Sequence, residues 1–236
     1  MTVFLNVLTG NILPIALVAS LGFVLRRRFD VHVGTLTSVV FNVLSPCLVF
    51  SALVGSQLPG EELLQLAAFS AISILTIGGL ALILTRLLRL GRAATAAVVI
   101  VAMFANGGNY GLTLLQLRYG DAGLSRGVVY FVTSTVIFYT LGVLIASLGR
   151  LTWRQSLARM LRVPAFYAAL LAVVVYGLRI PIPAPIMSGV TIAGQGAIPI
   201  MLLILGMQIA DMRRGETTSY VWPAVGLRLL AGPLVG

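Results

Sequence analysis

Two asparagines and three glycines stand together in the middle of a long apolar run. The stretch reads Ala105-Asn106-Gly107-Gly108-Asn109-Tyr110-Gly111. Both residue types disfavour a continuous helix, and backbone groups released inside lipid must face protein or a watery cavity. An interrupted helix there can present N–H groups and a half-helix dipole to a solute. Close packing through small residues is the alternative. It explains the glycines but not the asparagines, so we favour the interrupted helix.

Two other apolar runs carry an amide side chain four residues before a proline. One run contains Asn42 and Ser45-Pro46, and the other contains Gln195 and Pro199. An internal proline removes one helical hydrogen bond and kinks the helix. The predicted solute site therefore combines the three stretches: Asn106, Gly107, Gly108, Asn109, Tyr110, Gly111, Asn42, Ser45, Pro46, Gln195 and Pro199.

The residue types in the apolar runs exclude several kinds of chemistry. The six acids all map to loops or span ends: Asp30, Glu61, Glu62, Asp121, Asp211 and Glu216. A proton relay usually needs an acid within the membrane, and an intramembrane enzyme needs a nucleophile–base pair or a metal cluster. The chain has a single Cys47 and a single His32, so we expect no disulfide, metal or cofactor. Amides and hydroxyls suit a neutral or anionic organic solute.

One arginine, Arg228, falls inside an apolar run. It can snorkel back to the interface that Tyr220 and Trp222 mark, or it can face the cavity and pair with solute. We favour snorkelling.

The elements that must position these residues are membrane helices. Of the 236 residues 59% are hydrophobic and 9% are charged, with mean hydropathy +1.05. A soluble domain needs more charge, and only helices or closed barrels satisfy the backbone in lipid. The sequence predicts a polytopic all-α protein with about eight segments: Val3–Leu25, Leu36–Val54, Leu63–Leu84, Ala93–Leu117, Leu124–Leu148, Pro164–Leu178, Pro185–Ala210 and Val221–Gly236.

The net charge of +10 comes from arginine alone. Most of the arginines lie in the first, third, fifth and seventh loops, including a basic linker at 149–163 that we expect to lie against anionic lipid. Basic loops stay in the cytoplasm, so we predict a multi-pass protein of the cell or plasma membrane with its N-terminus outside. The same pattern argues against nucleic-acid binding.

The matched amide–proline pairs fall in the second and seventh segments. If five segments form one repeat, these two are equivalent, and an odd number of spans inverts the second repeat. We therefore predict a first repeat over 1–148, the cytoplasmic linker over 149–163, and a partial second repeat over 164–236. The last segment is short for a bilayer and ends on apolar residues, so we expect a fragment of a longer protein.

These stretches resemble the auxin efflux carrier family. The resemblance rests on Asn42 through Leu53, on Asn106–Leu115, and on Ile198-Pro199 through Met207, and it extends over essentially the whole chain. It implies ten helices in two inverted repeats, with the fourth and ninth broken and crossing at the midplane. It also implies export of small organic anions, with Asn106, Asn109 and Tyr110 lining the crossing and Asn42, Ser45 and Pro46 facing it.

The chain departs from this family at two places. Thr113 stands where many members have proline, so the break must rest on the glycines, and the ninth and tenth helices are absent. We expect that this polypeptide alone does not transport. The alternatives are a sodium-coupled bile-acid-type symporter, and a scaffold or degenerate membrane fragment without transport. The solute and the oligomeric state, including a homodimer, are left open.

Overall fold

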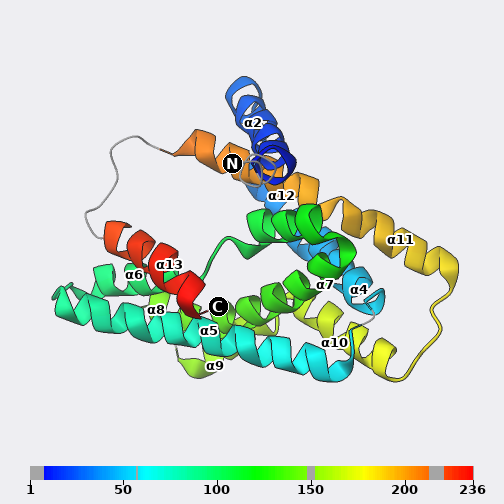
Figure 1. The fold of residues 1–236 in the computed structure, drawn as a ribbon. Helices are drawn as coiled ribbons and strands as arrows, with labels where there is room; N and C mark the ends of the chain where they lie inside the picture. Colours follow the sequence, from blue (N-terminus) through cyan, green and yellow to red (C-terminus); the bar gives the residue numbers. More distant parts are fainter. Residues whose placement is uncertain (1–7, 57, 148–151, 213–220, 236) are drawn as a thin grey trace. The chain divides into compact units, whose positions relative to one another are not determined.

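The computed structural model describes residues 8–56, 58–147, 152–212 and 221–235, and within these it contains helices and no strand (Figure 1). Five helical stretches of this described part are long and apolar enough to cross a membrane. A sixth results if the bent pair of α9 (Trp153–Met160) and α10 (Pro164–Gly177) is one span, and Trp222–Val235 is a shorter apolar helix.

The difference from eight predicted segments has three local causes. Helix α10 has only 14 residues, the last segment forms only the short helix Trp222–Val235, and the fourth and fifth segments join in one stretch, Arg92–Ala146. That stretch has 55 residues, which in a single straight helix would span roughly 80 Å, against roughly 30 Å of hydrocarbon. Gly120 interrupts it with a φ of +64° and a ψ of −152°, a conformation suited to glycine. The predicted boundary between the two segments therefore coincides with a real break.

The chain divides into two compact units, each described by itself. Unit 1 comprises Met1–Gly60, Asn106–Val132 and Val163–Met212. Unit 2 comprises Glu61–Ala105, Thr133–Arg162 and Arg213–Gly236. The units interleave along the sequence, and the division into sequential repeats stays a prediction.

In unit 1, α2 (Leu13–Arg28) packs against α12 (Ala197–Asp211) (Figure 1). Two glycines permit the contact: a Cβ on Gly22 would collide with the Leu203 carbonyl, and one on Gly206 with the Ala19 carbonyl. Small residues serve this purpose in membrane helix pairs, where close packing replaces the hydrophobic effect. The Arg26 Nε donates to Asp211 at 2.9 Å, so the C-terminal ends of α2 and α12 lie together.

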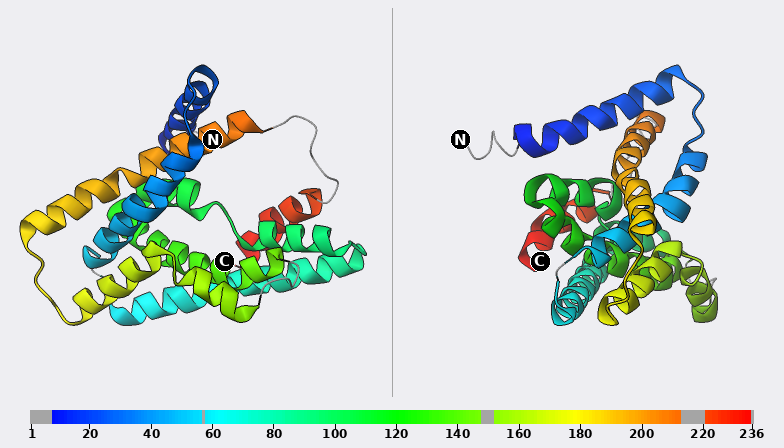
Figure 2. Two further views of the ribbon diagram at one scale, coloured as in Figure 1. Left: turned by 180° about the vertical axis from the view of Figure 1, so that it is seen from behind. Right: turned by 90° about the vertical axis from the view of Figure 1, so that its right-hand side faces the viewer.

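The second span of unit 1 contains a π-helical turn before its proline. It consists of α3 (Val33–Val39), the π-helical turn η2 (Val40–Leu44) and α4 (Ser45–Val54). Helix α4 packs on α10 and on α11 (Ala184–Gln195), where a Cβ on Gly194 would lie 2.9 Å from the Leu48 Cα (Figure 2).

Unit 2 contains α5 (Gly60–Leu87), α6 (Arg92–Met103), η4 (Phe138–Gly142), α8 (Val143–Ala146), α9 and α13 (Val221–Val235). Gly78 faces Met103, whose sulfur would lie 2.8 Å from an added Cβ, and the Phe104 ring meets Phe138 edge to face at 5.1 Å. Helix α9 lies in the predicted basic linker and begins with a reciprocal capping box between Thr152 and Gln155.

Candidate substrate site

The fourth apolar segment is interrupted, as predicted. Helix α6 ends at Met103, and the helix resumes as the π turn η3 (Gly107–Gly111), which continues into α7 (Leu112–Ile137). Phe104 and Asn106 between them have extended or irregular backbone, with ψ of 99° and 67°. The position differs slightly from our expectation: the break precedes the glycines, which lie inside the resumed helix.

Asn106 starts the second half-helix. Its side-chain Oδ1 accepts a hydrogen bond from the Asn109 N–H at 3.2 Å, and its carbonyl accepts one from the Gly111 N–H at 3.1 Å. An asparagine N-cap of this kind satisfies one of the helix's free donors. The Thr113 hydroxyl donates to the Asn109 carbonyl at 3.4 Å, so the residue in place of proline ties down the same turn. The half-helix therefore presents a capped, partially positive N-terminus at the break.

Gly108 of η3 serves close packing. A Cβ on Gly108 would lie 3.0 Å from the Phe131 ring, a tight contact, whereas one on Gly107 would lie at an ordinary contact distance of 3.5 Å from the Tyr130 ring. Both rings belong to α7, within unit 1. Close packing therefore explains Gly108, and the interruption of the helix explains Asn106, so the two interpretations apply to different residues of one motif.

The second motif lies in η2 and the start of α4. Asn42 is exposed, and its Nδ2 donates to the Ser38 carbonyl at 2.8 Å. Ser45 is 0% exposed, and its Oγ has no hydrogen-bond partner in the described part of the chain. Pro46 lies where η2 passes into α4, inside the continuous helical stretch Val33–Val54, so its missing N–H removes one helical hydrogen bond there. Ser45 is thus a buried hydroxyl that is free to donate a hydrogen bond.

The third motif divides α11 from α12. Gln195 ends α11, Gly196 separates the two helices, and Pro199 lies in the first turn of α12. Both Gln195 and Pro199 are exposed. The Ile200 N–H donates to the Gly196 carbonyl at 3.4 Å, so the helical path is nearly continuous through the junction.

Helix α12 brings the three motifs into one neighbourhood of unit 1. It packs against both η3 and η2, and α11 packs against η2 and α4. Asn109 and Tyr110 are half-buried, and their side-chain polar atoms have no hydrogen bond to other described residues. Amide and hydroxyl donors at a half-helix N-terminus can hold a carboxylate or another oxyanion. In the described residues no group of His, Cys, Asp or Glu could hold a metal ion.

Arg228 has a role that neither of the two sequence-based alternatives named. Snorkelling to the interface is not what the structure shows, because its Nη1 donates to the Ala102 carbonyl at 3.1 Å. Ala102 lies in the last turn of α6, where carbonyl groups receive no hydrogen bond from an N–H of the same helix. The signal was available: a helix interrupted in lipid needs a donor for its final carbonyls, and arginine suits a helix C-terminus.

Comparison with known proteins gives two matches. The family model described as membrane transport protein matches residues 7–151 and 148–236. A protein of Methanothermobacter thermautotrophicus, described as an uncharacterized transporter, is 26% identical over 233 residues, which cover 96% of this chain and 76% of that protein.

Proposed function

The chain belongs to the membrane transport protein family, the family of the auxin efflux carriers, and we propose that it works as a secondary carrier exporting small organic anions by alternating access. Membership makes it a multi-pass membrane protein of a transporter family. The solute class and the direction of transport are the proposal.

The observation that carries the proposal is the interrupted fourth segment. A carrier needs unwound backbone at a solute site, because only such backbone has free N–H groups to offer. The stretch Phe104–Asn106 provides it, and Asn106 opens a half-helix whose first N–H groups, those of Gly107 and Gly108, have no acceptor within the helix. A membrane scaffold would gain nothing from this interruption.

The distribution of charge favours an anion over a cation. In the described part of the chain, acids lie in a loop (Asp30), in the first turn of α5 (Glu61, Glu62), beside the Gly120 break (Asp121) and at the end of α12 (Asp211). Within the motifs the polar groups are amides and hydroxyls. A cation site would call for a carboxylate among them.

The compact units support the repeat interpretation. Residues of the first, second, sixth and seventh predicted segments belong to unit 1, while those of the third and eighth belong to unit 2. The first and sixth, second and seventh, and third and eighth segments would be equivalent in two five-helix repeats, and each pair falls in one unit. We propose inverted repeats on this basis, with the break in the fourth segment as half of a midplane crossing.

Efflux from proteoliposomes tests the proposal. The full-length natural protein is reconstituted, loaded with radiolabelled mono- and dicarboxylates, and compared with the double variant Asn106→Ala/Asn109→Ala. We expect carboxylate efflux from the parent protein and a loss of at least tenfold in the variant. Gln65→Ala is the matched control, since this exposed amide pairs only with Glu61 in the described structure.

Two results would contradict the proposal. Unchanged efflux in the double variant would remove Asn106 and Asn109 from the solute site. Flux that requires a sodium gradient would instead favour a bile-acid-type symporter.

A further inference from the structure

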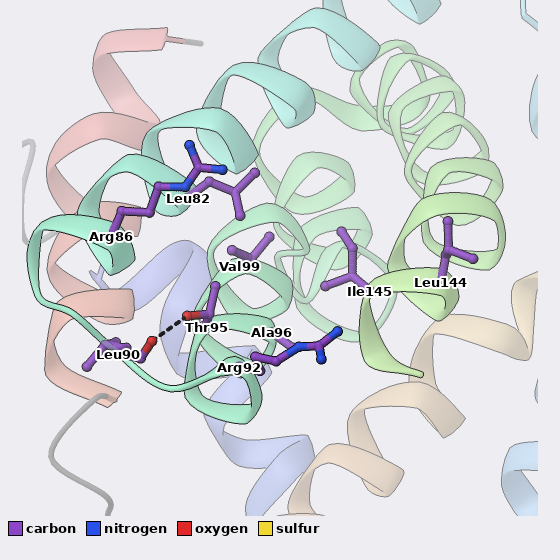
Figure 3. A pocket seen from close by; sticks show the side chains of 9 residues that line it. All are labelled: Leu82, Arg86, Leu90, Arg92, Thr95, Ala96, Val99, Leu144 and Ile145. Atoms are coloured by element: carbon purple, nitrogen blue, oxygen red, sulfur yellow. Dashed lines mark hydrogen bonds between the residues drawn. The ribbon is translucent and has the colours of Figure 1, made fainter. Parts of the chain in front are cut away.

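Unit 2 contains a cavity of about 410 Å³ between the end of α5, the start of α6 and α8 (Figure 3). Its interior is apolar: Ala96 and Val99 are buried beneath it, and Leu82, Leu144 and Ile145 form its sides. The predicted solute site uses none of these residues. The cavity is therefore a feature that the proposed transport function leaves unexplained.

Two arginines border this apolar cavity. Arg86 lies in the last turn of α5 and Arg92 begins α6, and Figure 3 shows their side chains on opposite sides of Thr95 and Val99. Both are exposed, and neither guanidinium makes a hydrogen bond or ion pair with another described residue. The segment 84–100 contains no acidic residue. Two positive charges thus face the cavity without compensation.

The start of α6 adds a second source of positive potential. Its N-cap, Gly91, offers no side chain to the first N–H groups, and the Thr95 hydroxyl is already directed to the Leu90 carbonyl at 3.3 Å. Arg92 is a cation at the positive end of a helix dipole, which is an unfavourable position. An anionic group bound between Arg86 and Arg92 would neutralise both arginine charges and the positive end of the α6 dipole.

The place of the cavity along its helices identifies the environment of that anion. It lies where α5 ends and α6 begins, at the third loop, which is one of the basic loops. Leu144 and Ile145 come shortly before the fifth loop, which is also basic. Helix ends rich in arginine lie at the depth of lipid headgroups, and basic pockets between membrane helices bind anionic headgroups. A free inorganic anion would contact the arginines and leave the apolar walls without a partner. A lipid would contact the arginines with its headgroup and the apolar walls with an acyl chain.

We propose that this cavity binds an anionic phospholipid, with its phosphate between Arg86 and Arg92 and an acyl chain along Leu82, Val99 and Ile145. A zwitterionic lipid is a poorer fit, because it adds its own cation to two arginines. The proposal is independent of the transported solute.

Native mass spectrometry of the full-length protein tests this directly. The protein is delipidated in a neutral detergent and titrated with phosphatidylglycerol, phosphatidylcholine or sodium phosphate. We expect one phosphatidylglycerol to be retained preferentially, and retention to fall by on the order of tenfold or more in Arg86→Gln/Arg92→Gln. The control Arg28→Gln/Arg89→Gln removes equal charge from exposed positions of the basic loops and should bind as the parent does.

A second variant keeps both charges. Leu82→Trp places a larger side chain at the cavity wall and should also reduce retention, while circular dichroism and size-exclusion profiles stay unchanged. Equal retention of phosphatidylcholine, an equal loss in Arg28→Gln/Arg89→Gln, or binding of inorganic phosphate that excludes the lipid would each overturn the proposal. If the arginine variant does not fold, the result with Leu82→Trp decides.

Discussion

The Nη1 of Arg228 lies 3.1 Å from the carbonyl oxygen of Ala102, so an arginine of α13 caps the last turn of α6 where the fourth segment is interrupted. Both residues belong to unit 2, and they are separated by 126 positions in the sequence. A charged donor here satisfies a carbonyl that the break leaves without a helical partner and places a positive charge at the negative end of the helix dipole.

Replacing Arg228 should therefore destabilise the interrupted segment. We expect Arg228→Gln to lower the free energy of unfolding by about 1–2 kcal/mol, because a hydrogen bond from a charged donor to a poorly solvated carbonyl is lost. Thermal unfolding in detergent measures it. Arg228→Lys retains the charge with a shorter reach and should recover part of the loss. If both variants unfold like the parent, the capping role is wrong and a lipid-facing or solute-facing arginine becomes the better explanation.

Substitutions at Asn106 can distinguish a role in capping the half-helix from a role in binding solute. Asn106→Ala should cost about 1 kcal/mol of stability, because the Asn109 N–H loses its acceptor. Asn106→Asp retains a good N-cap, and its negative charge favours the helix N-terminus. We expect the aspartate variant to unfold at or above the parent's temperature yet to export carboxylates poorly, since like charges repel. Stability and efflux measured on the same preparations check this, and an aspartate variant with full efflux would argue that solute does not approach Asn106.

The interruption shows how far sequence reasoning reached. Glycine and asparagine inside an apolar run indicated a break, and one occurs, but its position at Phe104–Asn106 depends on Asn106 acting as a cap and on the Phe131 ring packing against Gly108. That ring contact is a tertiary contact, which a hydrophobic pattern along the sequence does not reveal. Composition and hydropathy are local quantities, which is why they predicted helices well.

The prediction that the three motifs lie near one another rested on sequence spacing rather than on composition. Amide–proline spacing suggested equivalent second and seventh segments, and α12 does pack against η2 and η3. The Arg228–Ala102 contact was harder to predict, because an isolated arginine in an apolar run is compatible with several depths and rotamers. The pairing of Gly22 and Gly206 between α2 and α12 likewise requires knowing which helices are neighbours.

Ser45 permits a test in which stability and function should move in opposite directions. Its Oγ is fully buried and has no partner among the described residues, so the hydroxyl carries a desolvation cost without compensation. We expect Ser45→Ala to leave the unfolding temperature unchanged or to raise it slightly. If the hydroxyl meets solute when the carrier changes conformation, carboxylate efflux should fall in the same variant. Efflux equal to the parent's would remove Ser45 from the solute site and leave it as a packing residue.

The close approach of α2 and α12 predicts a strong asymmetry between two glycine substitutions. Gly206→Ala places a Cβ against the Ala19 carbonyl, a backbone atom that can yield only if the helices separate. We expect a loss of at least 2 kcal/mol, as in overpacked sites, and lower yields of folded protein in mild detergent. Gly79→Ala in α5 is the matched control, since nothing lies within 4 Å of an added Cβ. A helix gains up to about 1 kcal/mol from this exchange, so the control should be neutral or stabilising. Equal unfolding temperatures for the two variants, measured side by side, would mean that α2 and α12 are not in close contact in the membrane.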